Sequence, residues 1–157
     1  MTVNPVSRPL SRRALLAAAL LVSTGAASAS TPPTLVVHKT SGCGCCVLWI
    51  KRLQADGFRV TARDVGAGEL VQEKLKAGLK LEHTSCHTAR VDGYIVEGHV
   101  PPREIRRLLS EKPDAIGLAV PGMPVGSPGM EGGGKVEPYE VLLVARDGST
   151  TAFARYP

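Results

Sequence analysis

The stretch TLVVHKTSGCGCCVLWIKRLQADGFRVTARDV, residues 34–65, decides the fold of this chain. Its first five residues are largely β-branched and predict a short strand. Between residues 45 and 56, apolar side chains recur at helical spacing: Cys46, Trp49, Ile50 and Leu53. Gly57 ends this helix, and residues 58–65 alternate between apolar and polar side chains, which predicts a half-buried strand. A strand, a helix and a second strand in this order predict two parallel strands joined by a crossover helix.

The next segments continue the alternation of helices and strands. Residues 69–77 predict a second helix with Gly78 as its C-cap, and its apolar positions lie four apart: Val71, Leu75 and Leu79. The pair Asp92-Gly93 predicts a tight hairpin between two short strands. Pro101-Pro102 begins a third helix, since proline fits the first helical position. Its apolar face comprises Ile105, Leu108 and Leu109.

The C-terminal part contains a long loop and a last hairpin. Residues 117–134 hold ten glycines and prolines among 18 residues, so we expect no regular element there. Two apolar runs around Asp147-Gly148 predict a C-terminal hairpin. We therefore expect an α/β, thioredoxin-like fold, with a β-α-β plus β-β-α core, a long Gly/Pro loop and a C-terminal β-hairpin.

The N-terminal 29 residues have the layout of a secretory signal peptide. Arg8, Arg12 and Arg13 precede an unbroken apolar run over residues 14–22, and the small residues Ala27-Ser28-Ala29 follow. The run is too short to span a bilayer, so we expect no stable membrane anchor after cleavage. Arg12-Arg13 also resembles a twin-arginine signal, and both export routes stay open. We expect a signal peptide over residues 1–29, a single domain over residues 30–157, and a periplasmic location.

Removing the signal peptide changes the charge argument. The whole chain has 19 basic and 14 acidic residues, and residues 30–157 keep 16 basic and 14 acidic residues, a net charge of +2. This balance, without a basic cluster among aromatic residues, gives no reason to expect nucleic acid as a partner. The scattered carboxylates form no pair at acid–base spacing, so hydrolase chemistry has no support either.

Four cysteines carry the chemistry of the chain. Cys43, Cys45 and Cys46 lie where the first strand gives way to the first helix, and a helix N-terminus stabilises thiolates. Cys86 precedes the third strand, in a loop that faces this turn in a thioredoxin-like topology. We therefore expect the four sulfurs to meet in space.

The third cysteine of the motif favours metal binding over dithiol redox chemistry. A dithiol oxidoreductase needs only Cys43 and Cys46, whereas adjacent Cys45 and Cys46 can bridge several metal ions. Soft thiolates select Cu(I). Zinc is the less favoured rival, because it wants four ligands in a tetrahedron, and the spacing differs from that of structural zinc modules. A disulfide oxidoreductase using Cys43 and Cys46 stays open as the alternative function.

Other side chains extend the candidate ligand set. His87 directly follows Cys86, and imidazole suits both copper and zinc. Met123 and Met130 lie in the Gly/Pro loop, where a thioether can bind Cu(I) or can simply plug a groove. The remaining histidines stay open as ligands: His38, His83 and His99.

The motifs of the chain resemble those of the CopG-like periplasmic copper proteins, a family long described as a domain of unknown function. The resemblance rests on SGCGCC at residues 41–46, SCHT at 85–88, DGY at 92–94, EGHVP at 97–101, GLAVPGMP at 117–124 and GSPGME at 126–131. It implies a thioredoxin-like fold, copper binding and a role in copper resistance. It further implies that the cluster ligands are Cys43, Cys45, Cys46 and Cys86.

The sequence thus predicts a copper-binding protein, with redox activity at copper left open and no assignment as an enzyme. The expected metal ligands are Cys43, Cys45, Cys46, Cys86, His87, Met123 and Met130. The expected partners are copper ions and other periplasmic copper-handling proteins. A third interpretation, a structural zinc domain that binds another protein, predicts that chelation unfolds the chain.

Overall fold

The computed structural model describes residues 1, 32–132 and 134–157. The predicted signal peptide therefore lies outside the described residues, apart from Met1. Within the described part of the chain, no helix combines the length and the apolar character needed to cross a bilayer.

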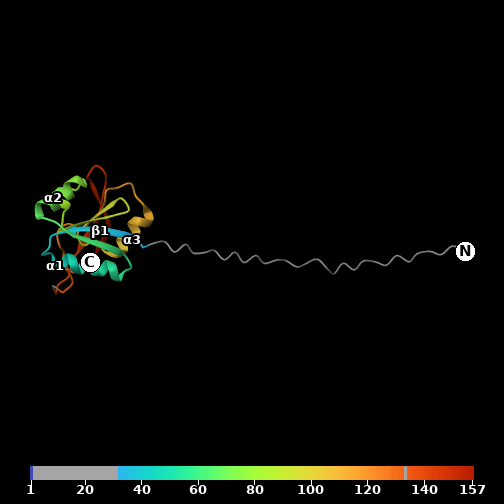
Figure 1. The fold of residues 1–157 in the computed structure, drawn as a ribbon, viewed down its shortest axis with the longest axis horizontal. Coiled ribbons are helices and arrows are strands. Elements are labelled where there is room, and N and C mark those ends of the chain that lie inside the picture. Colours follow the sequence, from blue (N-terminus) through green and yellow to red (C-terminus); the bar gives the residue numbers. More distant parts are fainter. Residues whose placement is uncertain (2–31, 133) are drawn as a thin grey trace. The chain divides into compact units, whose positions relative to one another are not determined.

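The described residues form three α-helices, one 3₁₀ turn and seven strands, which Figure 1 shows in chain order from blue to red. The strands belong to one sheet in the order β2-β1-β3-β4-β5-β6-β7. The elements are β1 (Thr34–Lys39), α1 (Gly44–Ala55), β2 (Arg59–Asp64), α2 (Ala67–Lys76), η1 (Leu81–His83), β3 (His87–Val91), β4 (Tyr94–Glu97), α3 (Pro102–Glu111), β5 (Gly117–Ala119), β6 (Tyr139–Val144) and β7 (Thr150–Tyr156).

The predicted fold class is confirmed. β1 and β2 precede and follow α1 in the chain and pair with each other in parallel. β3 and β4 form the antiparallel hairpin that leads into α3. Asp92 and Gly93 both have positive φ at the hairpin turn, as the tight-turn motif predicts. The Gly/Pro loop and the β6–β7 hairpin follow in the expected order. The arrangement is an α/β, thioredoxin-like fold with an extended sheet.

The start of the Gly/Pro segment differs from the prediction, because Gly117–Ala119 forms strand β5 inside the sheet. β5 pairs with β4 on one side and with β6 on the other. The ladder on both sides and the burial of Leu118 and Ala119 outweigh the poor strand propensity of this segment. Gly117 has a packing reason, since a Cβ there would collide with the carbonyl of Ile95.

The buried face of α2 also differs from the prediction. Val71 and Leu75 are 41% and 46% exposed, whereas Leu70 and Lys74 are buried. Lys74 faces inward because its ammonium group meets Thr88 and Glu97. The buried partner Glu97 thus explains why α2 turns Lys74, and not Val71 or Leu75, toward the interior.

Strand β2 is more exposed than its alternating pattern predicts. Only Val60 is partly covered within the strand, while Phe58, directly before it, is buried. β2 lies at the edge of the sheet.

The main core fixes α1 against the sheet. Trp49 of α1 is fully buried, and its indole N–H donates to the Val100 carbonyl at 2.9 Å. The core cluster joins Trp49, Ile50 and Leu53 of α1 with Leu35 and Val37 of β1 and with Ile105 of α3. A buried aromatic ring with a satisfied N–H is a strong anchor, so the first turn of α1 has a fixed position.

Candidate metal centre

The four cysteines converge at the N-terminus of α1. Cys43 is the N-cap residue of the helix, Cys45 and Cys46 lie in its first turn, and Cys86 comes from the loop before β3. All four Sγ atoms lie within 4.8 Å of one another. The topology-based expectation that Cys86 meets the motif in space is therefore confirmed.

Two of the four cysteines are bridged. Cys43 and Cys46 form a disulfide with their Cα atoms 5.3 Å apart, and Cys45 and Cys86 are free. Each free sulfur lies next to one bridged sulfur: Cys45 is 3.6 Å from Cys43, and Cys86 is 3.5 Å from Cys46. The two free sulfurs are 3.9 Å apart. The sequence left the presence of this disulfide open.

The first turn of α1 supplies electrostatic support for thiolates. The helix has no side-chain cap and no acidic residue in its first turn. The N–H groups and the dipole at this end are therefore available to negative charge.

Cys86 is a free, partly buried thiol. Burial, followed by the neighbouring Cys45, raises the pKa of the Cys86 thiol to about 12. The free chain therefore keeps Cys86 protonated at neutral pH, and a bound cation would have to displace that proton.

His99 is oriented toward Cys86. Its Nε2 lies 3.1 Å from Cys86 Sγ, and its Nδ1–H donates to the Pro128 carbonyl at 2.8 Å. Burial lowers the pKa of His99, which favours the neutral ring. A backbone carbonyl on one ring nitrogen leaves the other with a free lone pair, which is how metal-binding histidines are usually held.

His87 lies on the other side of the same sulfur. Its Nδ1 is 3.3 Å from Cys86 Sγ, and its Nε2 has no hydrogen-bond partner. Its ring packs at a tilt against the Trp49 ring, with the ring centroids 4.2 Å apart. Burial lowers the pKa of His87 well below the usual histidine value, and His99 and Lys74 add to this effect. Cys86, His87 and His99 thus form a second group of potential ligand atoms within 4.8 Å of one another.

The two predicted methionines have different positions. Met123 Sδ lies 4.0 Å from Cys45 Sγ, and the Met123 side chain is exposed. Met130 contributes backbone hydrogen bonds with Gly126 and Ser127, which hold the loop in shape. The structure therefore places the Met123 sulfur next to the cysteines. The contacts of Met130 described here are backbone contacts within the loop.

The other two histidines have acidic neighbours. His38 Nδ1 is 3.8 Å from Glu73, and His83 Nε2 is 3.5 Å from Glu82. Neither belongs to a group of three or more potential ligands in the part of the chain that the structure describes. The sequence leaves His99 open as a ligand together with these two. The missing signal was the partner of its Nδ1, which lies 29 residues away.

Residues 121–131, which we call the strap, link the elements that carry the site. Gly122 N–H donates to Thr84 O at 3.1 Å, and Pro128 O holds His99. Gly129 packs on the first turn of α1, where a Cβ would come within 2.8 Å of Trp49 N and Cys45 O. Only glycine fits this approach, so the glycine spacing of the strap has a physical reason.

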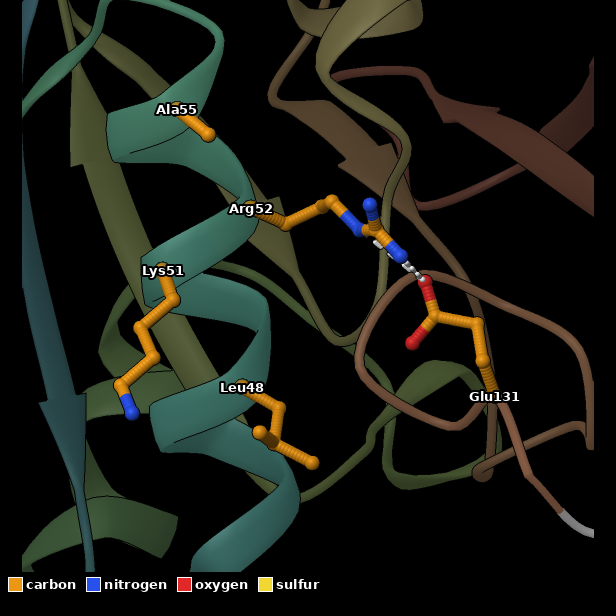
Figure 2. Close-up of a pocket in the computed structure, with 5 residues that line it drawn as sticks. All are labelled: Leu48, Lys51, Arg52, Ala55 and Glu131. Atoms are coloured by element: carbon orange, nitrogen blue, oxygen red, sulfur yellow. Dashed lines mark hydrogen bonds and ion pairs between the residues drawn. The ribbon is translucent and has the colours of Figure 1, made fainter.

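An ion pair fastens the end of the strap to α1. Figure 2 shows Arg52 reaching from the helix to Glu131, with Nε and Nη2 at 3.1 and 2.6 Å from Oε1. The second carboxylate oxygen of Glu131 accepts the Gly129 N–H at 2.7 Å. Glu131 thus ties the helix to the turn that packs on it.

A buried charged network supports the Cys86 loop from behind. The Glu97 carboxylate accepts hydrogen bonds from Lys74 Nζ at 2.5 Å, Ser85 N at 2.7 Å and Thr88 Oγ1 at 2.6 Å. The Ser85 contact fixes the backbone directly before Cys86. The network was not predictable from the sequence, since the partners of Glu97 lie 9 to 23 residues from it along the chain.

Comparison with known proteins gives a consistent set of relatives. The family described as "Protein of unknown function, DUF411" matches residues 83–130. A solved structure described as "Copper resistance protein copG- Form 2" is 46% identical, with a TM-score of 0.74, and the match covers 80% of this chain and 99% of that chain. A second, "Copper resistance protein copG- Form 1", is 44% identical, with a TM-score of 0.75 and coverage of 80% and 98%. No curated protein matches the chain.

Proposed function

The chain belongs to the CopG-like family of copper-resistance proteins, and from this premise we propose that it binds Cu(I) as cargo through Cys43, Cys45, Cys46 and Cys86. The observation that carries the proposal is the convergence of four Sγ atoms within 4.8 Å at a helix N-terminus. The reduced chain would offer a compact, thiolate-rich site. His87, His99 and Met123 are the neighbouring donors, and Met130 stays a candidate from the sequence alone.

The donor set favours copper over zinc. Cu(I) accepts low-coordinate, thiolate-rich sites, whereas structural zinc is held by four ligands in a closed tetrahedron. Cys45 and Cys46 are adjacent in the chain, so both cannot easily chelate one ion, but they can bridge neighbouring ions. We therefore propose more than one Cu(I) per chain.

Copper loading requires reduction of the bridge. The Cys43–Cys46 disulfide takes up two electrons and two protons from a dithiol reductant, which itself becomes a disulfide. Cu(I) then displaces the protons of the two new thiols, and these protons pass to the solvent. The number of free thiols thus rises from two to four on reduction.

The test is an anaerobic titration of the reduced protein, residues 30–157, with Cu(I) in competition with a chromogenic chelator. We expect a stoichiometry above one that falls in Cys45→Ser and Cys86→Ser. Ser110→Ala, on the exposed side of α3, is the control and should bind as the parent does. No binding tighter than that of the chelator would refute the proposal.

The disulfide favours a second candidate function, thiol–disulfide exchange. A Cys-x-x-Cys disulfide at a helix N-terminus on a thioredoxin-like fold is the arrangement of dithiol oxidoreductases. This function predicts insulin reduction that survives Cys45→Ser and is lost in Cys43→Ser. The copper-binding function instead predicts that Cys45→Ser lowers the amount of Cu(I) bound.

We also propose that the chain is exported to the periplasm, where its partners are other copper-handling proteins. The support is the signal-peptide pattern of residues 1–29, which leaves no stable membrane anchor once cleaved. Cell fractionation and the mass of the mature N-terminus test this proposal. An uncleaved chain in the membrane fraction would contradict it.

A further inference from the structure

The disulfide-bonded form of the chain keeps a set of free donors next to the bridge. Cys86 remains a thiol, and it shares a ligand group with His87 and His99. We propose that these three residues, the mixed site, bind one divalent transition-metal ion such as Zn²⁺ while Cys43 and Cys46 are bridged. The mixed site differs from the Cu(I) site in both donor set and redox form, so either proposal can fail without the other.

The distances within the mixed site fit a metal ion of this size. Cys86 Sγ is 3.1 Å from His99 Nε2 and 3.3 Å from His87 Nδ1. Tetrahedral zinc, with bonds of about 2.3 Å to sulfur and 2.0–2.1 Å to nitrogen, separates such atoms by about 3.5 Å. The side chains therefore need to move only a few tenths of an ångström.

His99 is the better prepared of the two histidines. The hydrogen bond to Pro128 O fixes its tautomer and leaves the Nε2 lone pair directed toward Cys86. His87 Nε2 is buried without a partner, so metal binding at Nδ1 would leave that N–H unsatisfied. We therefore assign Cys86 and His99 as the principal ligands and His87 as the third.

The donor chemistry distinguishes the mixed site from the four sulfurs. One thiolate with two imidazoles suits borderline divalent ions, whereas an all-thiolate set suits Cu(I). Binding replaces the Cys86 proton by the metal ion, and that proton passes to the solvent. A water molecule completes the fourth position, so the mixed site does not use Cys45.

The test uses the oxidised protein and Co²⁺ as a spectroscopic probe. Anaerobic alkylation and mass measurement first establish one disulfide and two free thiols. Co²⁺ is then added without a reductant, so that the disulfide stays intact. Co²⁺ is chosen over Cu²⁺ because Cu²⁺ would oxidise the free thiols. We expect one Co²⁺ per chain, a thiolate-to-cobalt charge-transfer band and displacement of the cobalt by Zn²⁺.

Variants assign the band to the mixed site. Cys86→Ser and His99→Gln should weaken Co²⁺ binding by at least about 100-fold, because loss of even an outer-shell partner costs 10–100-fold. Cys45→Ser and the control His38→Gln should keep the bound ion. Absence of the band, or a band that survives Cys86→Ser or His99→Gln, would overturn the proposal. Loss of the band in Cys45→Ser would also overturn the proposal, since the ion would then be bound by the two free thiols, Cys45 and Cys86.

A measurement on the unmutated protein guards against misfolded variants. In nitrogen-15 NMR spectra of the oxidised chain, Zn²⁺ should shift His99 Nε2 strongly and leave the His38 nitrogens in place. An unchanged His99 signal at saturating Zn²⁺ would overturn the proposal, whatever the variants do.

Discussion

At the scale of single residues, Glu97 and Lys74 form a buried ion pair. Both are buried, and each is the charged partner of the other. Removing one member of a buried pair leaves an uncompensated charge, whereas replacing both by apolar residues is often neutral. The contact from Glu97 to the Ser85 N–H connects this pair to the position of Cys86.

We predict that Glu97→Gln lowers the free energy of unfolding by about 3–5 kcal/mol, because Lys74 keeps a buried charge without a counter-ion. Urea unfolding of the oxidised, metal-free protein measures this. The matched control is Glu104→Gln, since Glu104 is similarly buried but its cationic partners Arg103 and Arg107 are 77% and 45% exposed and stay solvated. Equal losses in the two variants would contradict the prediction.

The double variant Lys74→Met with Glu97→Leu separates stability from positioning. It should regain most of the unfolding free energy, but it leaves the Ser85 N–H without its acceptor. We therefore expect weaker Cu(I) binding in a stable protein. Parental Cu(I) affinity in the double variant would show that Glu97 has only a structural role.

At the scale of elements, the strap is the part of the molecule that the sequence described least well. Its glycines and prolines predicted a loop, yet they could not show which glycine packs on α1 or which carbonyl holds His99. Those facts depend on contacts between segments far apart in the chain. The same limit explains α2, whose buried face follows from Lys74 meeting Glu97, and β5, whose strand follows from neighbours on both sides. The β-α-β unit and the convergence of Cys86 with the motif were predictable, because local periodicity and topology determine both.

We predict that Arg52→Met speeds the transfer of Cu(I) from the loaded protein to a competing chelator by up to about fivefold. The Arg52–Glu131 pair is largely exposed and so contributes at most about 1 kcal/mol, which corresponds to that factor. Opening of the strap then becomes easier, while the melting temperature stays nearly unchanged. Stopped-flow measurement of the chelator colour follows the rate.

The control for this prediction is another exposed arginine–glutamate pair in the same molecule. Arg155 Nε lies 2.7 Å from Glu140 on the β6–β7 hairpin, outside the strap. Arg155→Met should leave the transfer rate as it is in the parent. If both variants accelerate transfer equally, the effect comes from surface charge, and the strap does not control release.

At the scale of the whole molecule, the core is independent of the metal centre. The buried residues of the main apolar cluster come from α1, α3, five of the strands and the adjoining loops, and they include none of the four cysteines. A chain with its own core of this kind should fold without metal, unlike small zinc domains that fold only around the ion. The fold therefore argues against the structural zinc domain that the sequence left open as a third interpretation.

We predict that chelation of the Cu(I)-loaded, reduced protein lowers its melting temperature but does not unfold it at 25 °C. A ligand at about 1,000 times its dissociation constant stabilises the native state by about 4 kcal/mol, or roughly 10–20 °C for a domain of this size. Far-ultraviolet circular dichroism and calorimetry, before and after adding a Cu(I) chelator, measure both effects. A cooperative melting transition in the metal-free protein would place the metal centre on a preformed scaffold. Loss of that transition on chelation would instead make the metal part of the core and restore the structural interpretation.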